Sequence, residues 1–245
     1  MKIYDITRTL QDAPVYPGDM PVVLQPVSSM AEGNSCNLTL ITAGSHLGTH
    51  ADAPCHVLPD GEGIDRMPLE NFCGDCRVLT VTAEELIRID DLKGRLGGKA
   101  RIVLCTEGKR WLCEQAADYL VQCGVKLLVT DALSVAPADN ELAVHRILLG
   151  GGVAIVENAD LSGVPDDDYL IFAFPVKLGG GDGAPVRAVL LHAESAVPAP
   201  SPAIYVPEPL PAEMFAPSPE PDGAETQPET DSRPVDEPVD GATDP

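Results

Sequence analysis

Three of the five histidines of this 245-residue chain, together with one aspartate, gather in the segment SHLGTHADAPCH. They are His46, His50, Asp52 and His56. Imidazole and carboxylate groups are ligands that zinc, manganese and iron accept. For any single histidine, a surface or core position reached by chance is the better interpretation. Packing alone, however, does not require two histidines four residues apart with an aspartate two residues further on, so the spacing favours a metal site.

The spacing also limits the backbone shape of this segment. Even numbers of residues separate the four positions, so a fully extended strand would place all four side chains on one face. On a straight strand His46 and His50 would lie about 13 Å apart, too far for bonds of about 2 Å to one ion. Gly48 and Pro54 permit and enforce bends. We therefore expect a tight loop that closes around an ion.

Two later residues carry weaker signals of the same kind. His145 lies on an expected helix, and Glu157 ends the apolar run VAIVE. A buried glutamate at the end of a strand needs a cation or a hydrogen-bond donor. Taken alone, these residues would be a partly buried helix residue and a capped surface acid.

Two motifs receive structural interpretations. The glycine-rich run 179–183 resembles a phosphate-binding loop only superficially, because a strand rather than a helix follows it. We expect a turn there that could line the site. Cys73 and Cys76 have the spacing of a redox pair, but no helix begins at them, and we expect another turn.

The elements that position these residues are read from apolar periodicity and turn residues. Strands are predicted at about residues 2–7, 37–42, 77–82, 101–105, 125–130, 153–157, 169–174 and 186–191. Helices are predicted at 83–96 with Thr82 as N-cap, at 111–123 before Gly124, and at 140–149 before Gly150. Strands and helices alternate in the second half, which predicts an α/β domain.

The composition changes near residue 198, where proline becomes frequent and apolar periodicity ends. We expect one domain at 1–197 and a largely disordered, acidic, proline-rich tail at 198–245. Residues 206–245 contain eleven Asp or Glu against the single Arg233, nearly half of the net charge of −22. Nucleic acid is not an expected partner, because phosphate binding needs clustered Lys and Arg.

The location is predicted from what the chain lacks and from its cysteines. No stretch approaches the roughly 18 apolar residues of a membrane span, and the first residues do not form a secretion signal. The seven cysteines are an odd number and are scattered through apolar segments, which is typical of cytosolic thiols. We expect a cytoplasmic protein with no membrane partner.

The metal-binding segment resembles a known family. Residues 46–56 match the HxGTHxDxPxH signature of the cyclase family, which includes bacterial kynurenine formamidases and isatin hydrolases. PVYPGD at 14–19, DALSVAP at 131–137 and FPVKLGGGDGAPVRAVLL at 174–191 also resemble family segments. The resemblance covers about residues 1–195. It implies a swivelling β/β/α fold with a mixed, barrel-like sheet and flanking helices, and a homodimer or homotetramer.

The resemblance also implies a set of metal ligands. His46, His50 and Asp52 would bind a first divalent ion, and Asp52 could bridge to a second. His145 and Glu157 would complete the second site. One or two ions are expected, Zn²⁺ being favoured over Mn²⁺, although both tolerate these mixed ligands.

Two further roles follow from the resemblance. His56 matches the position of the family's catalytic acid/base, and Tyr16 lies where kynurenine formamidases carry a substrate-stacking tryptophan. The hypothesis is hydrolysis of an amide by metal-bound hydroxide, with His56 moving a proton to the departing amine. An arylformamidase of tryptophan catabolism, converting N-formylkynurenine to kynurenine and formate, is favoured. Hydrolysis of a cyclic amide or imide such as isatin is the rival, and a non-catalytic metal-binding scaffold is the second alternative.

Overall fold

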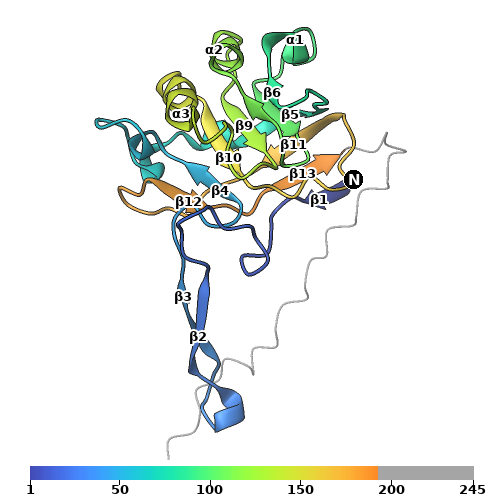
Figure 1. Cartoon of the computed structure of the whole chain (residues 1–245). Coiled ribbons are helices and arrows are strands. Elements are labelled where there is room, and N and C mark those ends of the chain that lie inside the picture. The colour runs from blue at the N-terminus through green and yellow to red at the C-terminus, as the bar shows by residue number, and fades with distance from the viewer. Residues whose placement is uncertain (193–245) are drawn as a thin grey trace, which may run out of the picture. The chain divides into compact units, whose positions relative to one another are not determined.

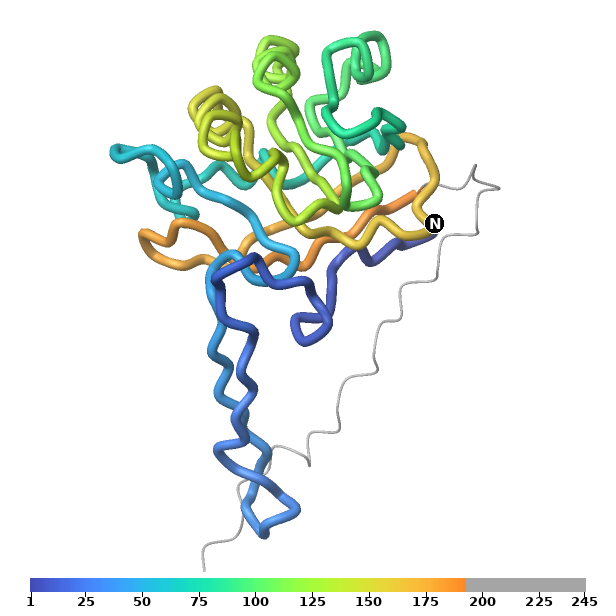
Figure 2. The backbone as a smooth tube through the Cα atoms, in the orientation of Figure 1, coloured from blue at the N-terminus to red at the C-terminus, as the bar shows by residue number. Residues whose placement is uncertain are grey.

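The computed structural model describes residues 1–192, so the expected tail at 198–245 lies outside the described residues. A nine-stranded sheet has the strand order β1-β13-β11-β5-β7-β9-β10-β4-β12 and curls into a half-barrel (Figures 1 and 2). The three α-helices of the described residues lie on one face of it (Figure 1). This arrangement confirms the predicted α/β domain with a mixed, barrel-like sheet and flanking helices.

The bounds of the elements are as follows. The large sheet contains β1 (Lys2–Asp5), β4 (His50–Asp52), β5 (Cys73–Thr80), β7 (Arg101–Cys105), β9 (Leu127–Thr130), β10 (Ala154–Glu157), β11 (Asp168–Phe172), β12 (Gly183–Pro185) and β13 (Val189–His192). Two smaller sheets pair β2 (Val23–Ser28) with β3 (Leu38–Thr42), and β6 (Leu86–Ile87) with β8 (Trp111–Leu112). The helices are α1 (Ile89–Leu92), α2 (Glu114–Gln122) and α3 (Glu141–Gly150).

The centre of the sheet is parallel and buried on both faces. Strands β5, β7, β9 and β10 pair in parallel, whereas all other neighbours in this sheet are antiparallel. Ile102 and Leu104 of β7 pack in the core beneath the helices, and Val103 between them packs in a second core inside the curl. Strands covered on both faces form continuous apolar runs, which is why the sequence predicts them well.

Helices α2 and α3 are confirmed close to their predicted positions. Their buried side chains, Ala116, Ala117 and Leu120 on α2 and Val144, Leu148 and Leu149 on α3, cover the parallel strands. Gly124 follows α2 with a φ of 75°, the left-handed backbone that ends many helices.

The predicted helix at 83–96 is wrong. Only α1 is helical in this stretch, and Leu86 and Ile87 form β6. The Trp111 amide donates to the Glu85 carbonyl and the Cys113 amide to the Ile87 carbonyl. These long-range backbone hydrogen bonds prevail over local helix propensity, which is a weak preference.

The predicted turn at Cys73 and Cys76 is also wrong. Both residues belong to β5, where Cys73 pairs with Phe172 and Cys76 with Tyr169 of β11. Residues three apart on a strand point to opposite faces, so the two thiols cannot meet. All seven cysteines are free. No helix among residues 1–192 is long and apolar enough to cross a membrane.

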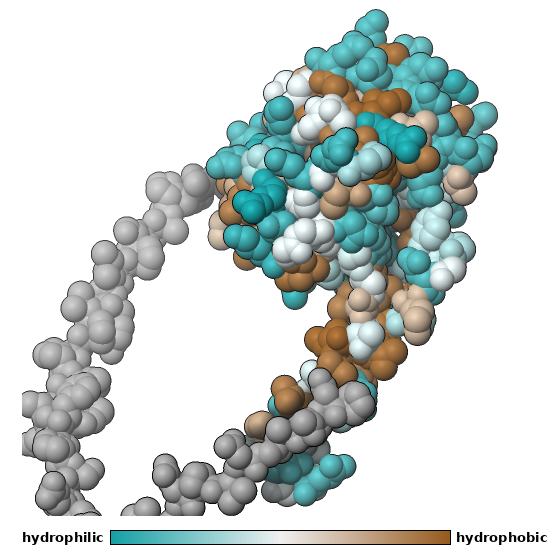
Figure 3. Space-filling model, turned by 90° about the vertical axis from the view of Figure 1, so that its left-hand side faces the viewer, coloured by the Kyte–Doolittle hydropathy of each residue, from teal (hydrophilic) through white to brown (hydrophobic). Residues whose placement is uncertain are grey.

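The β2–β3 hairpin projects from the rest of the domain as an arm, defined here as residues 20–42 (Figures 1 and 2). Its strands expose six large apolar side chains by 40% to 60%: Val23, Leu24, Val27, Leu38, Leu40 and Ile41. Apolar residues gather along the arm in Figure 3. An isolated two-stranded hairpin is marginally stable in water. The arm therefore combines weak intrinsic stability with uncovered apolar surface.

Candidate metal centre and substrate cavity

The site forms where the end of β10 meets β4. Glu157 and His50 are register partners on these antiparallel strands, so their side chains share a face. His50 Nε2 lies 3.7 Å from Glu157 Oε2 and 3.3 Å from Asp52 Oδ1. The tight loop expected over residues 46–56 is wrong in part, because His50–Asp52 is a short strand between β10 and β12.

The predicted bend lies just before this strand, at Gly48. Gly48 has a φ of 70°, and a Cβ there would meet Leu10 Cδ2 at 2.7 Å. The backbone angle is one that glycine adopts without strain, and a Cβ would in addition displace the Leu10 side chain. The bend returns His46 towards β4, where its Nδ1 lies 3.0 Å from Asp52 Oδ1.

Helix α3 contributes the fifth side chain. His145 Nε2 lies 3.4 Å from Asp52 Oδ2 and 3.2 Å from Glu157 Oε1. The structure thus brings together all five residues predicted as metal ligands. Two groups of potential ligand atoms, each within 4.8 Å of one another, share Asp52: His46 with His50, and His145 with Glu157.

The hydrogen bonds of two histidines orient their other nitrogens. His50 Nδ1 lies 2.9 Å from the Gly48 carbonyl, and His145 Nδ1 lies 2.8 Å from the Glu141 carbonyl. A carbonyl only accepts, so each Nδ1 carries the proton, and in the neutral ring Nε2 has a lone pair. Metal-binding histidines are oriented in this way.

These lone pairs point at carboxylate oxygens, which also only accept. Asp52 is fully buried, and its Oδ2 receives no hydrogen bond from any residue in the described range. A proton or a metal ion must lie between such groups for the arrangement to be favourable. The donor set of three imidazoles and two carboxylates therefore fits a divalent ion.

The pKa values follow from the same charges. Burial alone would lower the pKa of His145, but Asp52 and Glu157 raise it to about 11. Burial likewise opposes a charged His50, yet Asp52 and Glu157 raise its pKa to about 9. Burial would raise the pKa of Asp52, and the three histidines hold it well below its usual range. The two carboxylates thus favour positive charge at this centre.

His56 lies beside this centre, on the turn Pro54–His56 that follows β4. Its ring is 4.1 Å from that of His46, and its Nδ1 is 3.9 Å from Asp182 Oδ2. Burial lowers the pKa of His56, so the neutral form that accepts a proton predominates at pH 7. His46, His56 and Asp182 also form a third group with possible metal-ligand geometry.

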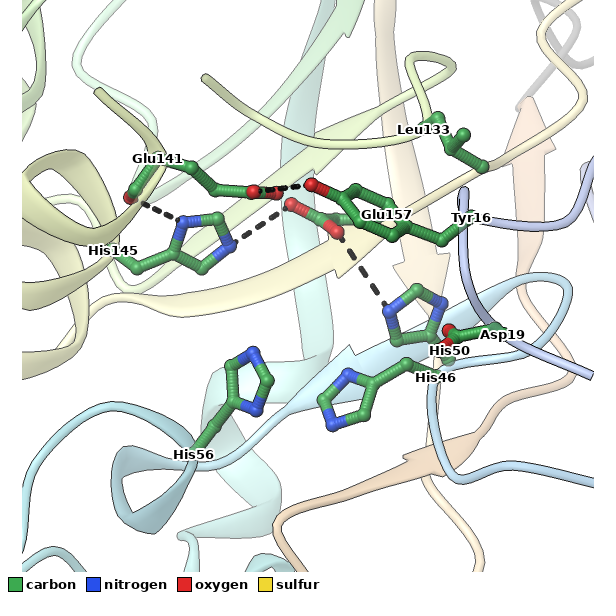
Figure 4. Close-up of a pocket in the computed structure, with 9 residues that line it drawn as sticks. All are labelled: Tyr16, Asp19, His46, His50, His56, Leu133, Glu141, His145 and Glu157. Carbon is green, nitrogen blue, oxygen red and sulfur yellow. Dashed lines mark hydrogen bonds and ion pairs between the residues drawn. The ribbon is translucent and has the colours of Figure 1, made fainter. Parts of the chain in front are cut away.

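A cavity of about 300 Å³ opens over these residues. His46, His50, His56, His145 and Glu157 line it, together with Tyr16, Asp19, Leu133 and Glu141. Figure 4 shows the Tyr16 hydroxyl pointing at the Glu141 carboxylate, to which it donates at 2.7 Å. The predicted substrate-binding residue therefore lies on the cavity wall.

Sequence reasoning did not identify Asp182 or Glu141. The glycine-rich run places Asp182 Oδ2 3.3 Å from His46 Nε2, although no residue of the run lines the cavity. Gly183 is the available signal, because a Cβ there would meet His46 Cε1 at 2.7 Å. Glu141 lies four residues before His145, one helical turn away on the same face. Helical spacing from a predicted ligand could have identified it.

Comparison with known proteins gives a consistent result. Residues 4–137 match the protein family described as "Putative cyclase". The chain is 33% identical over 199 residues to a kynurenine formamidase of Bacillus cytotoxicus, covering 76% of this chain and 95% of that protein. It is 35% identical over 209 residues to a kynurenine formamidase of Salinibacter ruber, covering 79% and 99%.

Solved structures share the fold. A potential metal-dependent hydrolase with cyclase activity superposes with a TM-score of 0.68 at 28% identity, covering 77% of this chain and 96% of that one. An isatin hydrolase bound to the product analogue thioisatinate superposes with a TM-score of 0.67 at 17% identity, covering 79% and 93%. At that identity the second likeness concerns the fold alone.

The ligand assignment predicts the metal content of variants. His50→Ala should lower bound divalent metal at least tenfold, because losing even an outer partner of a metal ligand costs about 10- to 100-fold in affinity. Purified proteins would be compared by inductively coupled plasma mass spectrometry. His192→Ala is the matched control, since His192 lies on β13, pairs with Asp167 and belongs to none of the candidate ligand groups found within residues 1–192. Equal metal content in the two variants would remove His50 from the ligand set.

Proposed function

The chain belongs to the cyclase family, and we propose that it is an arylformamidase, which hydrolyses N-formylkynurenine to kynurenine and formate. Relatives named kynurenine formamidase and metal-dependent hydrolase indicate the broader function, a divalent-metal hydrolase of non-peptide amide C–N bonds. The observation that carries the proposal is the cavity, which combines a cation-binding floor with an aromatic wall residue. Its volume is in the range of small-molecule sites.

The metal has a defined place in this proposal. His46, His50 and Asp52 would hold one ion, and His145 and Glu157, with Asp52 between the groups, would hold a second. Zn²⁺ is the ion we favour, with Mn²⁺ as the alternative, since both accept mixed nitrogen and oxygen ligands. When bound, such an ion lowers the pKa of water and polarises the carbonyl of the substrate.

The protein's own residues handle the protons. Hydrolysis adds the oxygen of water to the formyl carbon, breaks the C–N bond and leaves the nitrogen with one more proton. His56 is neutral and faces the cavity, so it takes a proton from the attacking water and delivers it to the departing arylamine. The Tyr16 ring provides an apolar face for the aryl group of the substrate.

Substrate assays decide between this reaction and its rivals. The purified protein with Zn²⁺ or Mn²⁺ should release kynurenine from N-formylkynurenine faster than it opens isatin, both followed by absorbance. Faster turnover of isatin would reverse the assignment. Turnover of neither would favour the non-catalytic scaffold, against which the intact set of five predicted ligands argues.

If His56 moves protons and does not bind metal, its substitution should lower activity without lowering the metal content. His56→Ala should lower kcat by about 10²- to 10⁴-fold, the usual contribution of a general acid or base. Its metal content should equal that of the wild type. Loss of metal together with activity would instead make His56 a ligand, as its proximity to His46 and Asp182 allows. The His192→Ala variant again serves as the control.

We further propose that the protein is cytoplasmic and binds neither nucleic acid nor membranes. The seven free thiols suit a reducing compartment. The net charge of −22 opposes contact with phosphate backbones or anionic lipid.

We also propose that the chain forms a homodimer or homotetramer through the arm. Apolar side chains project from both of its faces, since Leu24 and Ile41 are register partners and Leu40 follows on the opposite side. Glu32 is the only charged residue of the arm. Because the arm carries only this one charge, two strongly acidic chains can meet along it with few like-charge contacts, whereas a basic partner would be drawn to the acidic surface elsewhere.

The arm predicts the effect of charged substitutions on assembly. The double variant Leu40→Glu/Ile41→Glu should shift the protein to monomers, measured by size-exclusion chromatography with light scattering, because charge is costly in an apolar interface. Leu69→Glu alters an equally exposed leucine outside the arm and should leave the assembly intact. A wild-type monomer, or an unchanged oligomer in the double variant, would contradict the proposal.

A further inference from the structure

Glu141 is a carboxylate in the cavity that the metal centre does not use. It is the first residue of α3, and its backbone carbonyl orients His145. Its side chain instead turns to the cavity wall, where Oε2 accepts the Tyr16 hydroxyl at 2.7 Å (Figure 4). None of the three candidate ligand groups found within residues 1–192 contains it.

The hydrogen bond from Tyr16 orients the Glu141 carboxylate and leaves its charge in place. The hydrogen bond to Glu141 raises the pKa of Tyr16 to about 12, so Tyr16 remains a neutral donor at pH 7. A carboxylate can accept about four hydrogen bonds, and the single Tyr16 donor leaves capacity for others. Glu141 is half-buried, which reduces the screening of its charge by water.

No lysine or arginine of the described cavity lining pairs with this carboxylate. The nine lining residues, all within the described range, include Asp19 and Glu141 but neither Lys nor Arg. Apart from the proposed metal ligands and His56, the charged side chains of this lining are the two carboxylates of Asp19 and Glu141. This part of the lining is therefore acidic. A positively charged group on the substrate would complement it.

We propose that Glu141, positioned by Tyr16, determines specificity by binding an ammonium group on the substrate. This inference rests on the proposed arylformamidase function and makes it narrower. The preferred substrates are formylated arylamines whose side chain carries a primary amine, as N-formylkynurenine does. Isatin has no such group and gains nothing from Glu141, so the same residue discriminates between the two candidate reactions.

Two substrates that differ only by the amine test this specificity. N-formylkynuramine carries the ammonium group, and ortho-formamidopropiophenone is the same aryl ketone with hydrogen in place of the amine. The wild type should show the higher kcat/KM for N-formylkynuramine. In Glu141→Gln the ratio of the two kcat/KM values should fall about tenfold, the size expected for loss of one hydrogen bond to a charged group. An unchanged ratio would overturn the proposal.

A charge-matched control separates a specific contact from a general acidic field. Asp19→Asn removes another carboxylate of the cavity lining and should change the ratio much less. An equal fall in both variants would show a diffuse field and overturn the assignment to Glu141. Tyr16→Phe, which removes only the hydroxyl donor, should lower the ratio to an intermediate value.

A binding measurement keeps this inference distinct from the proposed reaction. Titration calorimetry with the deformylated compounds, kynuramine and ortho-aminopropiophenone, requires no turnover. Tighter binding of kynuramine that disappears in Glu141→Gln would support the ammonium site even if neither formamide were hydrolysed, in which case only the proposed function would fail. Hydrolysis of both formamides without preference, together with equal binding of both amines, would leave the function standing and reject the ammonium site.

Discussion

At the centre of this domain, histidine nitrogens that are hydrogen-bond acceptors in the neutral ring face carboxylate oxygens, which are also acceptors. The Nε2 atoms of His50 and His145 point at the carboxylates of Asp52 and Glu157, and the whole group is buried. Buried carboxylates without compensation cost several kcal/mol each, so this arrangement requires positive charge among its members. Protons can supply that charge, as the raised histidine pKa values indicate, and a divalent ion can supply it by displacing them. The cation requirement is thus part of the fold as well as of the chemistry.

The pairing of strands in the curled sheet holds these side chains at fixed separations. Strand β4 contributes His50 and Asp52 from between β10 and β12, and its register with β10 places Glu157 opposite His50. On its other side β4 pairs with β12, where Gly183 leaves the space that the His46 ring occupies. Helix α3 connects the parallel strands β9 and β10 and delivers His145 from above the sheet (Figure 1). Side chains on packed strands and helices are held more precisely than side chains on loops.

The sequence predicted what is local and missed what depends on distant pairing. The central strands and two helices could be predicted because their apolar patterns are continuous. The helix predicted at 83–96 failed because backbone pairing between β6 and β8 is not visible in a local pattern. Spacing alone singled out the histidine cluster, whereas His145 and Glu157 acquired roles only through the family resemblance, since the fold brings them to β4. Asp182 and Glu141 were missed for the same reason: their importance comes from the pairing of β12 and from one turn of α3.

Asn158 links the candidate metal centre to the cavity wall through hydrogen bonds. Asn158 follows Glu157 directly and has a φ of 57°, a left-handed backbone that asparagine tolerates better than most residues. This bend turns its side chain to donate to the Pro14 carbonyl at 3.1 Å, and its own carbonyl accepts the Thr49 hydroxyl at 2.9 Å. The segment that carries Tyr16 is therefore tied to the end of the strand that carries Glu157. Because Tyr16 in turn holds Glu141, at the start of the helix of His145, the proposed metal ligands and the residues of the cavity wall form one connected unit. A shift of β10 would move both sets together.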